Sequence, residues 1–233
     1  MGRKKNKSPA QAARTALVER YGLKNNKNAN YWFVRCPRTG ADWLFDSDLR
    51  IEHYYACESD PTVVNADYSF RKLAVQIDGV EYDARIDARV ELTGGEVELR
   101  RVQTLTEQAR ETNDQQEAAI AAAVTAAGAR YRLTTVDELG RISQRVRNWR
   151  RGYRFLRAAR LLTFVTTESN VRLRLEQRRD VTLEQLIASL PNEDGPLVVA
   201  AVMSLHRKRL ITSDLDINPL GKSTRLKWLG DAP

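Results

Sequence analysis

Cysteine and histidine are scarce in this sequence. Only two cysteines, Cys36 and Cys57, and two histidines, His53 and His206, occur among its 233 residues. Two cysteines do not form the disulfide framework of a small secreted domain, so free thiols in an intracellular protein are the simpler interpretation. Structural zinc sites use cysteine and histidine at short spacings such as Cys-x-x-Cys, and the sequence has no such motif. A zinc site is therefore not expected.

Long apolar runs are missing as well. No stretch is long enough to span a bilayer, and the basic segment 1–8 lacks the apolar stretch of a secretory signal. Hydrophobic residues make up 42% of the chain and charged residues 29%, which is the balance of a folded soluble protein. We therefore expect a cytoplasmic protein with no membrane partner.

Positive charge is in excess. Lysine and arginine number 38 against 30 acidic residues, and the formal net charge is +8. This excess favours a polyanionic partner, most simply nucleic acid. Segment 1–25 is predicted to be a basic arm followed by a helix that begins near Ser8 and stops at Gly22. The arm carries Arg3, Lys4 and Lys5, which either touch phosphates or only solubilise a frayed end.

Residues 26–140 alternate strand and helix signals, which predicts an α/β domain of the α+β kind. Two aromatic-rich runs, 31–34 and 42–45, flank a Pro-Arg-Thr-Gly turn and predict a hairpin. A helix capped by Ser47 follows, and strands are expected at 71–77, 81–92 and 96–103 with tight turns at 78–79 and 94–95. A helix from 104 to 127 and a short strand at 131–134 complete the domain.

Residues 141–233 are predicted to be mainly helical. Thr135 with Glu138 and Thr182 with Gln185 have the spacing of capping boxes, and a Gly-Pro pair at 195–196 opens a further helix. The tail from 210 to 228 has the pattern of a two-stranded wing. Two helices followed by a short hairpin indicate a winged-helix domain.

Several segments carry a resemblance to a known family through their order and spacing. They are the serine-led helix that ends at the Asp60-Pro61 turn, the hairpin of 79–103, the strand 130–134 and the stretch from Ser213 to Thr224. Together they resemble the TnsA-type transposon endonucleases, and the resemblance covers most of the chain beyond about residue 30. It implies a restriction-endonuclease-like mixed sheet flanked by helices, followed by an α-helical winged-helix domain. It also implies a nucleoid-associated, prokaryotic protein that takes part in transposition.

The positions that carry catalysis in that family hold other residues here. The family uses a helix glutamate, a strand aspartate and a Glu-x-Lys motif to bind a divalent metal and activate water. The resemblance puts Arg50 at the helix position, Arg85 at or within two residues of the strand position, and Arg101 and Gln103 at the Glu-x-Lys positions. A guanidinium has no lone pair for a metal, but its forked donors suit phosphate. We therefore expect a pseudo-nuclease without catalytic residues or metal, in which three arginines converge on one cleft.

A shifted register keeps an acidic set instead. Glu52 on the helix, Asp87, and Glu98 with Arg100 supply three carboxylates and a cation. Glu98 and Arg100 share one face of a strand because side chains alternate. This interpretation predicts an active, Mg²⁺-dependent endonuclease that cuts at transposon ends. The same carboxylates also fit a solvated strand face paired with neighbouring arginines.

Segment 145–157 contains six arginines and no acidic residue. Like charges along a helix repel, so a solvated helix face normally mixes signs. We expect this face to contact a nucleic-acid backbone, and the alternatives are an acidic protein surface and a plain solvated face. The predicted DNA-binding residues on this helix, at the end of the last helix and on the wing are Arg145, Arg147, Arg150, Arg151, Arg154, Arg157, Arg207, Lys208, Lys222 and Arg225.

Three functions remain open at the level of the sequence. The first is a non-catalytic TnsA-like subunit of a transposition complex. It would bind transposon-end DNA and bridge a TnsB-like transposase and a TnsC-like AAA+ ATPase, while an active TnsA paralogue or another partner cuts the strands. The second is the active endonuclease with Mg²⁺ as its cofactor. The third is a stand-alone DNA-binding regulator of a mobile element.

Overall fold

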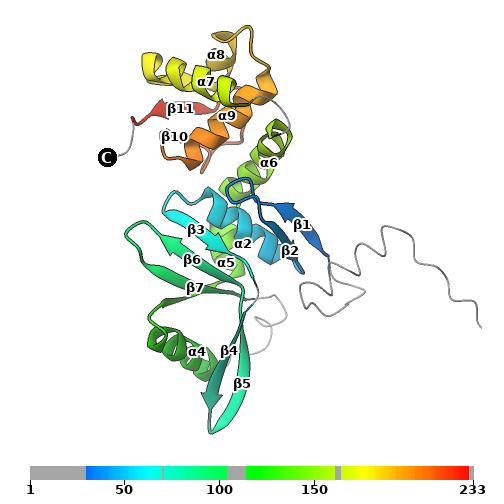
Figure 1. Ribbon diagram of the computed structural model, residues 1–233, viewed down its shortest axis with the longest axis vertical. Helices are drawn as coiled ribbons and strands as arrows, with labels where there is room; N and C mark the ends of the chain where they lie inside the picture. The colour runs from blue at the N-terminus through cyan, green and yellow to red at the C-terminus, as the bar shows by residue number, and fades with distance from the viewer. Residues whose placement is uncertain (1–29, 70, 104–113, 161–163, 231–233) are drawn as a thin grey trace, which may run out of the picture.

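The computed structural model describes residues 30–69, 71–103, 114–160 and 164–230. The expected basic arm and first helix, with Arg3, Lys4 and Lys5, lie outside the described residues, as do residues 104–113 of the predicted long helix. The described chain is a mixed α/β protein with strands gathered at one end, helices and a small sheet at the other, and one long helix between them (Figure 1). No helix in these ranges is both long and apolar enough to cross a membrane.

The first elements match the sequence prediction. Strands β1 (Trp32–Arg35) and β2 (Asp42–Phe45) form the expected antiparallel hairpin. Helix α2 (Asp48–Ser59) follows directly and is capped by Ser47, whose hydroxyl accepts a hydrogen bond from the backbone N–H of Arg50. This cap satisfies one of the free N–H groups that every helix start leaves unpaired.

A mixed four-stranded sheet forms the centre of the α/β part. Its order is β3 (Val63–Asp67), β6 (Ala88–Leu92), β7 (Val97–Val102) and β8 (Arg130–Thr134). Only the β7–β8 pair is parallel. Helix α4 (Asp114–Ala126) connects these two strands, as a parallel crossover requires.

Asp87 interrupts the strand that was predicted over 81–92. The chain forms β5 (Val80–Ile86) before it and β6 after it, and β5 pairs with β4 (Arg71–Ile77) in a separate two-stranded ribbon. The carboxylate of Asp87 accepts a hydrogen bond from the N–H of Val102 at 2.8 Å, so its side chain meets the C-terminal end of β7. The continuous-strand prediction was therefore wrong, and strand β3 was not foreseen.

Helices α2 and α4 cover opposite faces of the sheet. On β7, Leu99 packs in the hydrophobic cluster that contains Ile120 and Val124 of α4. The next residue, Arg100, places Nη1 3.3 Å from Sγ of Cys57 on α2. Because successive strand side chains point to opposite faces, the sheet lies between the two helices.

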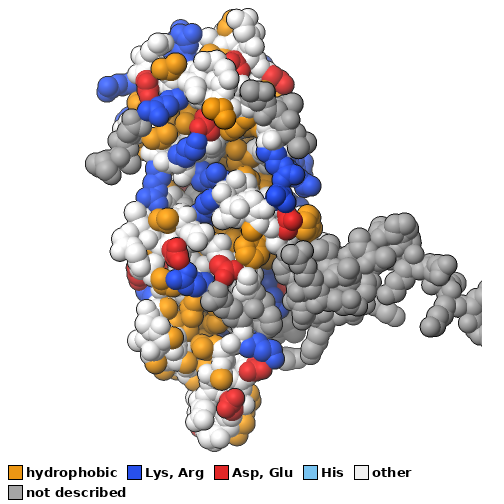
Figure 2. Space-filling view, viewed as in Figure 1, with side chains coloured by type: hydrophobic (Ala, Val, Ile, Leu, Met, Phe, Trp, Pro, Cys, Tyr) orange, Lys and Arg blue, Asp and Glu red, His pale blue; other side chains and the backbone are white. Residues whose placement is uncertain are grey.

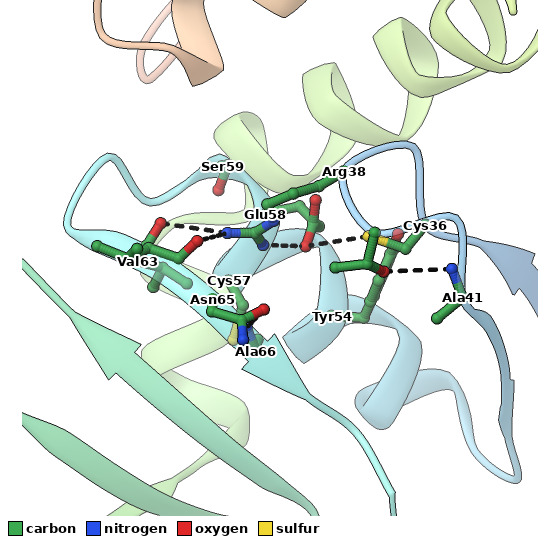
Figure 3. A network of polar contacts seen from close by, with 12 residues as sticks. Cys36, Arg38, Ala41, Tyr54, Cys57, Glu58, Ser59, Val63, Asn65 and Ala66 are labelled. Atoms are coloured by element: carbon green, nitrogen blue, oxygen red, sulfur yellow. Dashed lines mark hydrogen bonds and ion pairs between the residues drawn. The ribbon is translucent and has the colours of Figure 1, made fainter.

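Arg38 ties the hairpin to α2 and to the first strand of the sheet. Its guanidinium pairs with the buried carboxylate of Glu58, and Nη1 donates to the carbonyl oxygens of Val63 at 3.2 Å and Val64 at 2.8 Å. Figure 3 shows the Arg38 side chain lying between Glu58 and the start of β3. A buried charge is tolerated when it is paired and hydrogen-bonded, so this contact serves the structure.

The second half of the chain contains a three-stranded sheet. The wing predicted as two strands is β10 (Ile211–Ser213) and β11 (Arg225–Trp228), but β11 also pairs with β9 (Asp180–Thr182), which was not foreseen. Both predicted capping boxes are present. The helices of this half are α5 (Val136–Arg141), α6 (Ser143–Ala159), α7 (Phe164–Arg178), α8 (Leu183–Ala188) and α9 (Gly195–Arg207).

Helix α6 belongs to both halves of the molecule. Val146 and Tyr153 pack in the core around α2, whereas Trp149 and Leu156 pack in the core around α9. The two sets occupy different faces of the same helix, which follows from its period of about 3.6 residues. α6 is thereby packed along two adjacent faces, about 60° apart at 100° per residue, and its arginine-bearing face is more exposed.

Candidate functional site

Arg50 and Arg85 both bind the carboxylates of Asp46 and Asp87, beside the break between β5 and β6. Arg50 Nε and Arg85 Nε each lie 2.7 Å from Oδ1 of Asp87. Arg50 Nη1 is 2.8 Å from Oδ1 of Asp46, and Arg85 Nη1 is 2.9 Å from Oδ2 of Asp46. The cations of α2 and β5 therefore share two anions. One lies between β2 and α2, and the other lies between β5 and β6.

The electrostatics of this cluster are those of a closed ion-pair network. Burial alone would raise the pKa of Asp46, but the charge of Arg50 and the hydrogen bonds from Arg85 outweigh it and hold the pKa below its ordinary value. Burial would lower the pKa of Arg50, and the charges of Asp87 and Asp46 raise it. Both groups are therefore charged, and the four formal charges cancel.

The expected convergence of three arginines holds for two of them. Arg101 lies on the α4 face of the sheet and pairs with Glu117 of α4. Gln103 is buried directly after β7, and its backbone N–H donates to the carbonyl of Thr134. Because Arg50 and Arg85 are neutralised and Arg101 points away, the predicted open cleft of three arginines was wrong.

The alternative acidic set is not assembled into one site. Glu98 stands opposite Val90 in the β6–β7 register, whereas Asp87 bonds to β7 at Arg100 and Val102. Asp87 thus meets β7 about three residues beyond Glu98, or roughly 10 Å at the rise of a strand. In the described ranges, no group of three His, Cys, Asp or Glu side chains has the arrangement of a metal site.

Glu98 is instead the centre of a second arginine cluster. It is 0% exposed and pairs with Arg100 and Arg130, while Arg132 Nη1 lies 3.9 Å away. Burial would raise the pKa of Glu98, but the hydrogen bond from Arg130 and the charge of Arg100 lower it below its ordinary value. Its oxygens are occupied by guanidinium donors and are not free to bind Mg²⁺. Glu52 is partly exposed on α2 and lies two residues, about 200° around the helix, from the Asp87-binding Arg50.

Five arginines form one face of α6. Positions 147, 150, 151, 154 and 157 fall within about 120° of arc at 100° per residue. The helix contains no acidic residue, and the row extends about 15 Å along the axis at 1.5 Å per residue. Figure 2 shows Lys and Arg side chains gathered in the middle of the molecule, at the level of α6. Arg145 lies on the other side of the helix, so the predicted set divides into a row and one separate residue.

The arginines of this row differ in the contacts that their side chains make. Arg150 stacks on Trp32, with its Cζ 4.8 Å from the ring centroid. Arg151 donates to the carbonyl of Leu220 at 3.0 Å, and Arg147 donates to the side chain of Gln144. Among the described residues, Arg154 and Arg157 have neither a hydrogen bond nor an ion pair. Their donors remain available to a ligand.

The C-terminal cations are less available than the sequence suggested. Helix α9 is buried along most of its length, from Val198 to Leu205, between α6 and α7. It therefore does not present a long exposed face, and the cations that were predicted to bind DNA lie at its C-terminal end. There Lys208 pairs with Glu168, and between β10 and β11 Lys222 pairs with Glu184. Arg207 is half-buried, and Arg225 is exposed on β11.

Sequence reasoning did not find the structural roles of two residues, Asp46 and Asn148. Asp46 carried no signal because it lies in a turn and gains its role only by meeting Arg85, 39 positions later. Asn148 on α6 is buried, and its side chain bonds to the backbone of Leu215, Asn218 and Leu220. Asn148 is an amide in an arginine-rich amphipathic helix, and it lies on the buried face. This position is the signal that could have indicated its structural role.

Comparison with known proteins adds no identification. Neither a scan against protein-family models nor a search of curated proteins finds a match for this chain. The functional argument therefore depends on the geometry described above.

Proposed function

We propose that this protein is a non-catalytic, TnsA-like DNA-binding subunit of a transposition complex. Its α/β half would have a restriction-endonuclease-like fold that binds DNA without cutting it, and its second half a winged-helix fold. A TnsB-like transposase and a TnsC-like AAA+ ATPase are the partners proposed with it, and strand cutting falls to another subunit.

The order of elements supports both fold proposals. With the β4–β5 ribbon taken as an insertion between β3 and β6, helix α2, the antiparallel strands β3, β6 and β7, helix α4 and the parallel strand β8 follow the helix-strand-strand-strand-helix-strand order of a restriction-endonuclease-like core. Helix α7, β9, α8, α9, β10 and β11, with sheet order β10-β11-β9, follow the order of a winged helix.

The exposed arginine row of α6 is the observation that carries DNA binding. Like charges three and four residues apart destabilise a helix by a few tenths of a kcal/mol per pair, and α6 has no acid to offset them. Phosphates would supply that offset, because arginine forms bidentate, charge-assisted bonds to them. The contact would be to the backbone and would not read sequence.

The decisive experiment measures the binding of a fluorescent duplex by anisotropy at several salt concentrations. Replacement of Arg154 and Arg157 by glutamine should lower the affinity roughly tenfold and reduce the slope of log K against log salt by about 2. Arg178→Gln is the matched control, since it removes an exposed arginine of α7. If the double variant keeps the wild-type affinity and slope, the arginine row does not bind DNA.

Association with neighbouring transposition proteins tests the bridging role separately. Co-purification with the transposase or the AAA+ ATPase of the same element would support a subunit of a complex. DNA binding without either partner would favour a stand-alone regulator instead.

A further inference from the structure

A half-open cavity lies on the α2 face of the sheet, away from the arginine row of α6. Its volume is about 210 Å³. This is below the roughly 300–1,000 Å³ of pockets for drug-sized ligands, so the cavity suits one small group. The lining comes from the end of α2, from β7, β8, α5 and the start of α6, namely Ala56, Asp60, Arg100, Arg132, Thr134, Glu138, Leu139, Arg141, Ile142 and Arg145.

The lining is rich in positive charge. Four of its ten side chains are arginines and two are acids. Both acids are already engaged locally, because Asp60 accepts the N–H and hydroxyl of Thr62, and Glu138 accepts the backbone N–H of Thr135 in the capping box of α5. Neither carboxylate is therefore fully available to neutralise the arginines.

Among the described residues, three of the four arginines have no carboxylate within hydrogen-bonding distance. The nearest acid to Arg132 is Glu98 at 3.9 Å, and the nearest to Arg145 is Asp216 at 3.8 Å, both beyond hydrogen-bonding distance. Within the described ranges, Arg141 has no ion pair. Nε of Arg145 is buried and has no hydrogen-bond partner there. A buried donor without an acceptor costs about 1–3 kcal/mol, and a bound anion would remove that cost.

Glu98 cannot supply the missing charge. Its oxygens already receive Arg100 and Arg130, and it is fully buried beneath the cavity wall that Arg100 forms. The charge of Arg100 is therefore paired with Glu98, although its Nη2 has no hydrogen-bond partner among the described residues, and the other three guanidiniums line the cavity. Three forked donors around one small space match the several oxygens and the double charge of a phosphate group.

We propose that this cavity binds a phosphomonoester dianion through Arg132, Arg141 and Arg145. The group comes either from the 5′ end of a DNA strand or from a small phosphorylated molecule, and both present the same chemistry. The site does not depend on DNA binding by α6, because Arg145 lies on the side of that helix opposite Arg154 and Arg157.

Inorganic phosphate is the first probe, titrated into the full-length protein by calorimetry at low ionic strength. Saturable binding is expected, and Arg132→Gln and Arg141→Gln should each weaken it at least fivefold. Both replaced side chains are exposed, so the fold should survive, which thermal unfolding checks. Arg178→Gln, which removes an exposed arginine far from the cavity lining, should leave phosphate binding unchanged.

Matched oligonucleotides with a 5′-phosphate or a 5′-hydroxyl distinguish the two sources. Tighter binding of the phosphorylated strand by the wild type, lost in Arg141→Gln, assigns the site to a DNA end. Equal binding of the two strands, with phosphate binding intact, assigns it to a small molecule. Absence of saturable phosphate binding, or wild-type affinity in both glutamine variants, overturns the proposal. Arg154→Gln/Arg157→Gln reports on the α6 surface independently.

Discussion

Arg50 Nε donates a hydrogen bond to Oδ1 of Asp87 over 2.7 Å. The cation comes from the first turn of α2 and the anion from the break between β5 and β6, so the contact joins a helix to the sheet it covers. A metal-dependent nuclease would need this carboxylate free to coordinate its ion. Here Oδ1 is held by two guanidiniums, one from Arg50 and one from Arg85, and Oδ2 accepts the N–H of Val102.

Removal of Arg50 should therefore destabilise the fold. Arg50→Ala leaves Asp87 and Asp46 with Arg85 as their shared cation. Removing one partner of a buried ion pair costs about 3–5 kcal/mol, and the loss here should lie at the lower end because Arg85 remains. Urea denaturation measures this as a lower free energy of unfolding. Lys72→Ala, which breaks the exposed pair with Asp83, is the control and should change it by less than about 1 kcal/mol. Equal effects of the two variants would show that the Asp87 network carries no special stability.

The purified protein should not cut DNA. With Asp87 and Glu98 both occupied by arginines, supercoiled plasmid incubated with Mg²⁺ or Mn²⁺ is expected to stay intact, as measured by gel electrophoresis. Specific nicking that Asp87→Ala or Glu98→Ala abolishes would reverse the conclusion and restore the active-endonuclease hypothesis.

Local signals predicted the elements well, and long-range contacts explain what they missed. The Ser47 cap and the Thr182–Gln185 capping box depend on residues three apart, so the sequence alone was sufficient for them. The break at Asp87 depends on a hydrogen bond to Val102, 15 residues away, and no periodicity reveals it.

The contacts of individual side chains were harder to predict from the sequence than the helices and strands were. Arg101 and Arg100 are neighbours in sequence, yet one pairs with Glu117 and the other with Glu98 on the opposite face. A shift of one residue in register exchanges these faces. The resemblance fixed the alignment only to within a residue or two, so it could not decide which arginines meet.

Close packing between α6 and α9 gives a further prediction. A Cβ added at Gly152 would lie 2.5 Å from Cε and 2.7 Å from Sδ of Met203, which is fully buried. Gly152→Ala should overpack this contact and lower the free energy of unfolding by about 1–3 kcal/mol. Gly140→Ala in α5 is the matched control, because a Cβ there meets nothing within 4 Å. It should be neutral or stabilising by about 0.5–1 kcal/mol. A neutral Gly152→Ala would mean that the side chain of Met203 can move aside without cost.

The buried His53 predicts how stability depends on pH. Burial, with the nearby charge of Arg100, lowers the pKa of His53 from its ordinary value of 6.5 to about 3. Below pH 6.5 the unfolded chain therefore binds a proton at His53 that the folded chain does not bind. The free energy of unfolding falls as the pH decreases through this range. The loss from His53 between pH 6.5 and 5 is roughly 1.5 kcal/mol.

The pH interval from 6.5 to 5 separates the contribution of the histidines to stability from that of the carboxylates. Asp46 and Glu98 have lowered pKa values, so the stability they contribute is lost only at more acidic pH, below their unfolded values of about 4. His53→Gln should flatten the curve of unfolding free energy against pH between 6.5 and 5, as measured by urea denaturation at each pH. Burial also lowers the pKa of His206, so His206→Gln is needed to separate the two contributions. A wild-type slope in His53→Gln would mean that His53 binds its proton in the folded protein.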